Sequence, residues 1–238
     1  MNFFDVTILG IIEGITEFLP ISSTGHLILS SQVFKIPQTE FLKTFEISIQ
    51  LGAILAVVAM YWRKLLLEKQ VIYRIITAFI PTAILGLLFY KIIKTVLLGS
   101  NTVIIWSLLI GGLVLIGFEL LFKEKETAIK EIKDISYSQA VVVGLFQSIA
   151  MVPGVSRSAA TILGGMSLGL SRKLIVEFSF LLAVPTMAAA TGLDLLKNAP
   201  SFSLNEFYLL AVGFVVSFIV AIASIKFLLA FVKKYSFI

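Results

Sequence analysis

The sequence predicts an all-α protein that crosses a membrane several times. Of its 238 residues, 58% are apolar and 14% are charged, and the mean hydropathy is +1.03, whereas soluble domains have an apolar share nearer a half. Apolar runs recur from end to end without strand-like alternation. Because a bilayer core offers no hydrogen-bond partners, such runs cross it as helices and not as a barrel. We expect one membrane domain, residues 1–238.

Five apolar runs are long enough to cross a hydrocarbon core of roughly 30 Å, which takes about 20 helical residues. Two other apolar stretches, 8–19 and 139–152, are too short, and each leads into a proline, Pro20 or Pro153. We expect each short stretch to enter the membrane, turn and return as a re-entrant helical hairpin, which is tolerated where protein or a water-filled cavity covers its irregular backbone. The spans are 41–62, 71–93, 103–122, 174–196 and 207–232, and the returning stretches are 27–34 and 159–170.

The two hairpin regions resemble each other in sequence. ILGIIEGITEFLPISST aligns with VVGLFQSIAMVPGVSR, which pairs Glu13 with Gln147 and, after one gap, Pro20 with Pro153. The spans that follow also align, FEISIQLGAILA with FSFLLAVPTMAA. We predict an inverted-topology repeat, because a unit with an odd number of crossings places the next unit upside down. Repeat one is 1–122, a hairpin plus three spans, and repeat two is 136–238, a hairpin plus two spans, with no third span before the sequence ends.

Basic residues are distributed unevenly over the predicted loops. If the loop that holds Arg63 is cytoplasmic, twelve basic residues fall inside and five outside, as the positive-inside rule expects. Hairpin one then enters from outside and hairpin two from the cytoplasm, so their tips can meet near the midplane. We read the net charge of +5 as a topology signal and expect no nucleic-acid partner. The inner set is Arg63, Lys64, Lys69, Arg74, Lys123, Lys125, Lys130, Lys133, Arg172, Lys173, Lys233 and Lys234, and the outer set is Lys35, Lys43, Lys91, Lys94 and Lys197.

The stretch EGITEFLPISSTGH, residues 13–26, places polar chemistry in apolar surroundings. Glu13 and Glu17 are four residues apart, so both carboxylates project from one helix face. A solvated face is the alternative, but the flanking residues are apolar, and an ionisable residue inside a membrane is a functional candidate by default. Two such acids suit a proton carrier or a shared divalent cation, and oxygen ligands favour magnesium or calcium over zinc.

Hydroxyl residues follow Pro20, which we expect to end the first helix of hairpin one. Gly25 would allow a tight turn before the next helix starts near His26, and N–H groups at such a helix start form an anion site. Helix capping is the alternative for the serines, but nearby acids and His26 supply the base that an activated hydroxyl needs. For His26, the alternative to a catalytic or phosphate-contacting role is an ordinary interior position. The hydroxyl residues are Ser22, Ser23 and Thr24.

The tip of hairpin two, PGVSRSAAT, carries the opposite charge. Arg157 stands alone in a long uncharged stretch, where an unpaired guanidinium would be costly. Its planar fork fits phosphate, while a structural ion pair with Glu13 or Glu17 is the alternative. Further donors on this tip are Ser156, Ser158 and Thr161.

Weaker signals lie elsewhere in the apolar spans. Glu46 and Gln50 either line a cavity or join helices. The glycines at 111–112 and 164–165 predict close helix packing. The absence of cysteine excludes a thiolate nucleophile or thiolate metal site.

Both tips together are specific enough to indicate a family. EGITEFLPISSTGH and PGVSRSAAT, with FEISIQLGAILAV and EFSFLLAVPTM, resemble the bacterial undecaprenyl pyrophosphate phosphatases of the bacitracin-resistance type over essentially the whole chain. The resemblance implies hydrolysis of the C55 lipid carrier pyrophosphate to undecaprenyl phosphate and inorganic phosphate, which recycles the carrier for peptidoglycan synthesis and confers bacitracin resistance. It also implies a multi-pass protein of the bacterial plasma (inner) membrane. The sequence departs from the family in its last span and in a short loop after the first span.

The resemblance also implies roles for single residues. The family's paired acids fall on Glu13 and Glu17, its candidate nucleophile on Ser23, its histidine on His26 and its phosphate-binding arginine on Arg157. It further implies a divalent cation and a homodimer. Attack by Ser23, with Glu17 or His26 taking the proton, and direct attack by water both stay open. The alternative function is a secondary transporter or lipid flippase, which inverted repeats and broken helices would equally suggest.

Overall fold

The fold is helical in a computed structural model of the chain, which describes residues 1–92, 100–124, 126–198 and 203–233. Across these ranges the backbone forms α-helices and two short 3-10 helices, with a single isolated bridge between Ile129 and Leu170 and no strand. This confirms the predicted all-α class. The α-helices are α1 Phe3–Thr16, α2 Ser23–Val33, α3 Glu40–Leu67, α4 Lys69–Ile92, α5 Asn101–Leu121, α6 Tyr137–Ser148, α7 Arg157–Ser167, α8 Arg172–Asn198 and α9 Leu204–Phe231, and the 3-10 helices are η2 Ile132–Asp134 and η3 Ile149–Met151.

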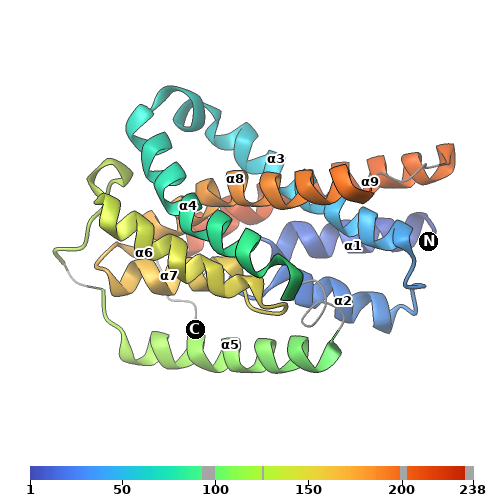
Figure 1. Ribbon diagram of the computed structural model, residues 1–238, viewed down its shortest axis with the longest axis horizontal. Helices are drawn as coiled ribbons and strands as arrows, with labels where there is room; N and C mark the ends of the chain where they lie inside the picture. The colour runs from blue at the N-terminus through green and yellow to red at the C-terminus, as the bar shows by residue number, and fades with distance from the viewer. Residues whose placement is uncertain (93–99, 125, 199–202, 234–238) are drawn as a thin grey trace.

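Five helices in the described part of the chain, α3, α4, α5, α8 and α9, are long and apolar enough to cross a membrane. They match the five predicted spans, so the chain is a multi-pass membrane protein. Their surroundings differ: 56% of the most apolar window of α8 is buried inside the protein, against 6% for α5. Figure 1 shows why, since α5 forms a layer of its own below the other helices and touches them mainly through α2 and α7.

The two short apolar stretches each pack against the helix that follows them, α1 against α2 and α6 against α7. The boundaries of the first pair differ from the prediction. α1 ends at Thr16 and not at Pro20, because proline has no N–H to donate to the Thr16 carbonyl and disfavours helical backbone in the residue before it. α2 begins at Ser23 and not near His26, because Ser22 already acts as its N-cap.

The tight turn of the first tip also differs from the prediction. The residue with left-handed backbone is Ser22, with φ of 66°, and not Gly25. Gly25 lies in the first turn of α2, where an added Cβ would come within 2.9 Å of Leu108 of α5. Gly25 therefore lets Leu108 pack closely on α2, and a larger residue there would require Leu108 to shift. In the second tip a glycine does adopt the positive φ, Gly154 at 91°.

The first helix of each pair, α1 or α6, packs along a span from the other half of the chain. α1 lies along α9, and α6 lies along α4, while α3 contacts both α8 and α9 (Figure 1). Small residues permit these approaches: a Cβ on Gly10 would lie 2.9 Å from the Gly213 carbonyl oxygen, and one on Gly144 would lie 2.0 Å from the Ala78 carbonyl oxygen. The halves of the chain are thus interleaved.

Of the two glycine pairs predicted to mark close packing, one is confirmed. Added Cβ atoms would lie 2.5 Å from Phe146 at Gly164 and 2.3 Å from Ile175 at Gly165. The prediction is wrong for residues 111–112, where a Cβ would meet nothing within 4 Å. That pair lies on α5, whose surface is mostly uncovered.

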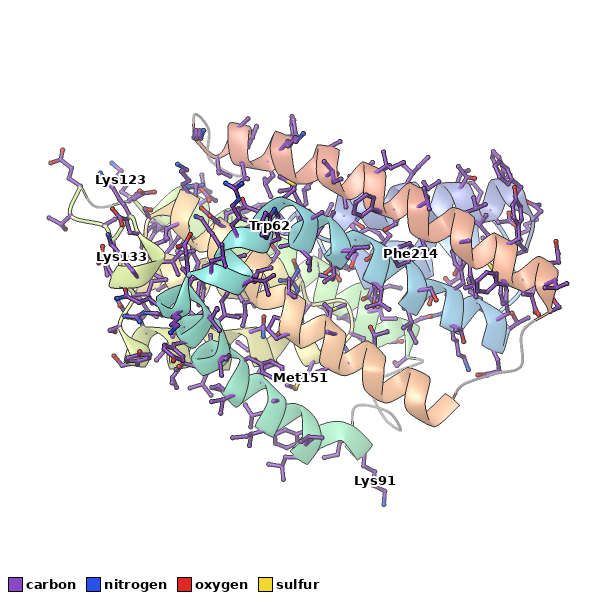
Figure 2. The ribbon with its side chains drawn as sticks, turned by 90° about the horizontal axis from the view of Figure 1, so that it is seen from above. Trp62, Lys91, Lys123, Lys133, Met151 and Phe214 are labelled. Carbon is purple, nitrogen blue, oxygen red and sulfur yellow. The ribbon has the colours of Figure 1, made fainter. Side chains whose placement is uncertain are left out.

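Charged loop residues gather at one end of the molecule. Lys123 and Lys133, both predicted to be cytoplasmic, lie at the same end in Figure 2, and Lys91, predicted to lie outside, is placed well away from them. Three of the basic residues used for that prediction, Lys94, Lys125 and Lys234, fall outside the described residues.

Candidate functional site

The two tips present helix N-termini built in the same way. Ser22 accepts a hydrogen bond from Gly25 N at 3.4 Å, and Ser156 accepts one from Ala159 N at 3.1 Å. Both serines are therefore caps, which was the alternative considered for Ser22 and was not considered for Ser156, and both also lie on a cavity wall. The first residue after the cap is Ser23 in α2 and Arg157 in α7.

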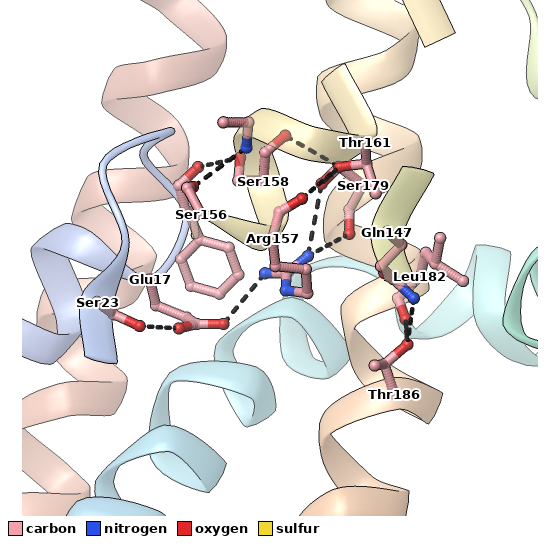
Figure 3. A network of polar contacts seen from close by, with 12 residues as sticks. Glu17, Ser23, Gln147, Ser156, Arg157, Ser158, Thr161, Ser179, Leu182 and Thr186 are labelled. Carbon is pink, nitrogen blue, oxygen red and sulfur yellow. Dashed lines mark hydrogen bonds and ion pairs between the residues drawn. The ribbon is translucent and has the colours of Figure 1, made fainter. Parts of the chain in front are cut away.

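A chain of polar contacts joins the tips, as Figure 3 shows. Ser23 Oγ donates to Glu17 Oε2 at 2.5 Å, and Arg157 Nη2 donates to Glu17 Oε1 at 3.1 Å. All three side chains are largely buried, the ion-paired side chains being 11% exposed for Arg157 and 5% for Glu17. The ion pair with an acid of hairpin one, which was the alternative considered for Arg157, is present and is made with Glu17. One carboxylate thus contacts a hydroxyl on one side and a guanidinium on the other.

A second set of contacts joins Arg157 to Ser179 of α8 and to Thr161 of its own helix. Its Nη1 donates to the Ser179 carbonyl at 3.0 Å, and the Ser179 and Thr161 hydroxyls are 2.6 Å apart. Ser158 Oγ donates to the Phe18 carbonyl at 2.9 Å, so it ties the second tip to the first. Ser158 and Thr161, predicted to contact substrate, are buried behind the site and are engaged with protein atoms. Their observed contacts support the position of Arg157.

A cavity of about 230 Å³ opens where the tips meet. Its polar wall includes Glu17, Ser23 and Arg157, which the sequence had singled out as a catalytic set. The apolar part of the wall comes from η3, from Val155 and from α8. The other polar lining residues are Ser22, Thr24, Ser156, Thr82, Gln147 and Thr186, and the apolar ones are Ala150, Met151, Val155, Met187 and Ala190. The cavity therefore offers both a charged end and an apolar surface.

Glu13 lies one turn before Glu17 and is fully buried. Neither of its carboxylate oxygens has a hydrogen-bond partner among the described residues. Uncompensated carboxylate oxygens are costly in a protein interior, and they are the hard anionic donors that magnesium and calcium prefer. The described residues hold no group of three or more His, Cys, Asp or Glu side chains able to bind a metal. A divalent cation here would thus have one or two carboxylates of the described residues as its protein ligands, a number that is common for magnesium.

His26 sits near the site without joining its polar chain. Its Nδ1 lies 2.8 Å from the Ser22 carbonyl oxygen. Since a carbonyl only accepts, this nitrogen carries a proton. This contact joins the His26 side chain to the N-cap residue of α2.

Four polar residues at the site were not predicted from the sequence to be functional. They are Thr82, Gln147, Ser179 and Thr186. Gln147 Nε2 donates to Thr82 at 2.9 Å and to Thr186 at 3.0 Å. Both threonines follow a proline inside an apolar helix, Pro81 in α4 and Pro185 in α8. This repeated Pro-Thr dipeptide within apolar spans was the available signal. The shorter of the two Arg157 contacts to Ser179 is made by the backbone carbonyl, which no side-chain pattern reveals.

The fold and the site define a multi-pass helical membrane protein with a buried, charge-paired site between two helical hairpins. The family model "Bacitracin resistance protein BacA" matches residues 6–238. Proteins named undecaprenyl-diphosphatase are similar over nearly the whole chain: that of Aquifex aeolicus (strain VF5) is 50% identical, covering 99% of this chain and 92% of that protein, and that of Sulfurihydrogenibium sp. (strain YO3AOP1) is 54% identical, covering 100% and 93%. This chain belongs to the bacitracin resistance protein BacA family.

Proposed function

We propose that the protein is an undecaprenyl pyrophosphate phosphatase, which hydrolyses the C55 lipid pyrophosphate to undecaprenyl phosphate and inorganic phosphate. The names of relatives about half identical in sequence support this function over the transporter alternative. The observation that carries the proposal is the contact chain Ser23–Glu17–Arg157 on a cavity wall. A hydroxyl bonded to a base, next to a guanidinium, supplies a nucleophile and charge stabilisation for phosphoryl transfer.

In the mechanism that this geometry favours, Ser23 Oγ attacks the terminal phosphorus while Glu17 accepts its proton. Glu17 is the better base than His26 here, because only Glu17 is hydrogen-bonded to Ser23. The bond from phosphorus to the bridging oxygen breaks, and the lipid monophosphate leaves. Water then hydrolyses the phosphoserine and restores Ser23. Arg157 stabilises the negative charge that builds on the phosphoryl oxygens.

We propose that Glu13 and Glu17 hold a divalent cation, magnesium or calcium, together with the substrate phosphates. The unpaired oxygens of Glu13 support this role. When bound, the cation would neutralise charge on the diphosphate. Glu17 also contacts Ser23 and Arg157 and lines the cavity, whereas Glu13 is not among the lining residues, so Glu13 would bind the ion from behind Glu17.

We also propose that the α1–α2 and α6–α7 hairpins are re-entrant and that residues 1–122 and 136–238 are inverted repeats. The exchanged packing of α1 on α9 and of α6 on α4 is what a two-fold relation would produce. Met151 of the cavity wall lies near the middle of the molecule, away from the lysine-rich end (Figure 2). A diphosphate could then be hydrolysed with its tail in the bilayer of the bacterial inner membrane. The homodimer stays a prediction.

The test is a phosphate-release assay on purified protein with undecaprenyl or farnesyl pyrophosphate, with and without a chelator. We expect release that depends on divalent cation and that Arg157→Ala abolishes. Arg63→Ala is the matched control, because Arg63 is exposed and lies over Trp62 outside the cavity. Transport of lipid across vesicle walls without any phosphate release would replace this proposal with the transporter.

A further inference from the structure

Gln147 is held more rigidly than a cavity-lining amide requires. It is 1% exposed, and its Nε2 donates both protons, one to Thr82 and one to Thr186. The two threonine hydroxyls cannot donate back, because Thr82 already donates to the Gly144 carbonyl at 3.0 Å and Thr186 to the Leu182 carbonyl at 2.8 Å. The network thus fixes which end of the amide faces the threonines.

The carbonyl end of this amide is left without a partner. Gln147 Oε1 is buried and accepts no hydrogen bond from the described residues. A buried acceptor without a partner is unfavourable unless a bound molecule donates a hydrogen bond to it. Arg157 has an unpaired donor: its Nε is buried and donates to no acceptor among the described residues. Both residues line the same cavity, and in Figure 3 Arg157 lies between Gln147 on one side and Glu17 with Ser23 on the other.

We infer that Gln147 binds the protonated oxygen of the terminal phosphoryl group and so selects the singly protonated form of the substrate's phosphate. The P–OH donates to Gln147 Oε1, and another oxygen of the same group accepts from Arg157 Nε. A fully ionised phosphoryl group has only acceptor oxygens, so its oxygen and the oxygen of the Gln147 amide would repel each other and form no hydrogen bond. A phosphate monoester has a second pKa of about 6, so the protonated form is available near neutral pH. This inference rests on the proposed function, because it names the form of the substrate that the same site takes.

Inorganic phosphate and sulfate separate this role from simple anion binding. Both are tetrahedral anions of similar size, but at neutral pH phosphate keeps an O–H and sulfate has none. A site that must satisfy a buried acceptor rejects the analogue that lacks the donor, because the acceptor stays unpaired. We expect the wild-type protein to bind phosphate about 10-fold or more tightly than sulfate, measured by calorimetry on protein in nanodiscs without turnover.

The variant Gln147→Leu should bring the phosphate-to-sulfate ratio close to one, since it removes the acceptor and keeps the size. Thr186→Val, which removes one of the two hydroxyls that orient the amide, should lower the ratio partly and serves if Gln147→Leu does not fold. Arg157→Met should weaken both anions together and leave a preference for phosphate. Gln70→Leu, an exposed site outside the cavity, should change nothing.

Equal binding of the two anions by the wild type, or a ratio that survives Gln147→Leu, would overturn the inference. Absence of any anion binding would overturn it as well. Phosphate release by the wild-type protein is scored separately, so a protein that releases phosphate without preferring it to sulfate retains the proposed function and loses only this role for Gln147.

Discussion

The two helical hairpins share a scaffold and differ in chemistry. Their second helices, α2 and α7, each have 11 residues and begin after a serine cap. Directly after that cap the first hairpin has Ser23 and the second has Arg157. The capping serines, Ser22 and Ser156, are separated by the same number of residues as Glu13 and Gln147. When the two hairpins are aligned on these serines, the sequence alignment therefore needs no gap, whereas alignment on the two prolines needs one.

The difference shows that neither hairpin is a site by itself. The first carries two carboxylates on one helix face and no cation, and the second carries a guanidinium with no acid of its own. Inside a membrane each would be unfavourable alone. Contact between the tips pairs Glu17 with Arg157, and Ser158 binds the Phe18 carbonyl beside them. The two hairpins therefore bring opposite charges together where their tips meet.

The largest effect on activity is expected from removing the hydroxyl of Ser23, the residue directly after the cap of the first hairpin. Ser23→Ala should lower the rate of phosphate release by about 10⁴-fold or more, near 5.5 kcal/mol of activation free energy, because the nucleophile is lost. Stability should change little, since Glu17 keeps Arg157. The control Ser136→Ala removes a cap on α6 outside the cavity and should cost about 1 kcal/mol of stability with activity retained. If Ser23→Ala keeps most of its activity, water attacks directly.

Much of this arrangement could be predicted from the sequence, because long apolar runs and isolated charges inside them have few structural solutions. The five spans, both hairpin regions and the Glu17–Arg157 contact follow from such patterns. The ends of the helices could not be predicted in this way. Ser22, and not a glycine, has the left-handed backbone, and because Ser22 caps α2, that helix begins at Ser23, before His26. These depend on which side chain caps an N-terminus, a competition among neighbouring hydroxyls.

The roles of buried polar residues from distant helices were also beyond the sequence. Ser158 points to a backbone carbonyl 140 residues away, and Gln147 is oriented by threonines on α4 and α8. Such partners are set by three-dimensional packing and not by spacing along one helix. The prediction of close packing at Gly111 and Gly112 of α5 was wrong for a related reason. The sequence does not show whether another helix covers these glycines.

The Glu17–Arg157 pair tests whether the hairpins meet for chemistry or only for structure. Glu17→Leu leaves a buried guanidinium without its acid and should destabilise the fold by about 3 to 5 kcal/mol. The double variant Glu17→Leu with Arg157→Met should recover most of that loss, because two apolar side chains replace two charges. Thermal unfolding in detergent measures stability, and phosphate release measures function.

The same double variant should show no phosphate release although it is folded. Recovery of activity together with stability would mean that the pair is a structural ion pair, and the catalytic role of both residues would then be withdrawn. Arg157→Met alone should cost less stability than Glu17→Leu alone, because Glu17 keeps its contact with Ser23.

The smallest expected effects concern how tightly each hairpin packs on the opposite half of the chain. An added Cβ at Gly144 would lie 2.0 Å from a backbone oxygen of α4, whereas one at Gly10 would lie 2.9 Å from a backbone oxygen of α9. Gly144→Ala should therefore destabilise by about 1 to 3 kcal/mol, and Gly10→Ala by less. Gly111→Ala, where nothing lies within 4 Å, should stabilise α5 by up to about 1 kcal/mol through helix propensity. Thermal unfolding of the three variants gives the order, and a larger loss at Gly10 than at Gly144 would show that the first hairpin is the more tightly packed of the two.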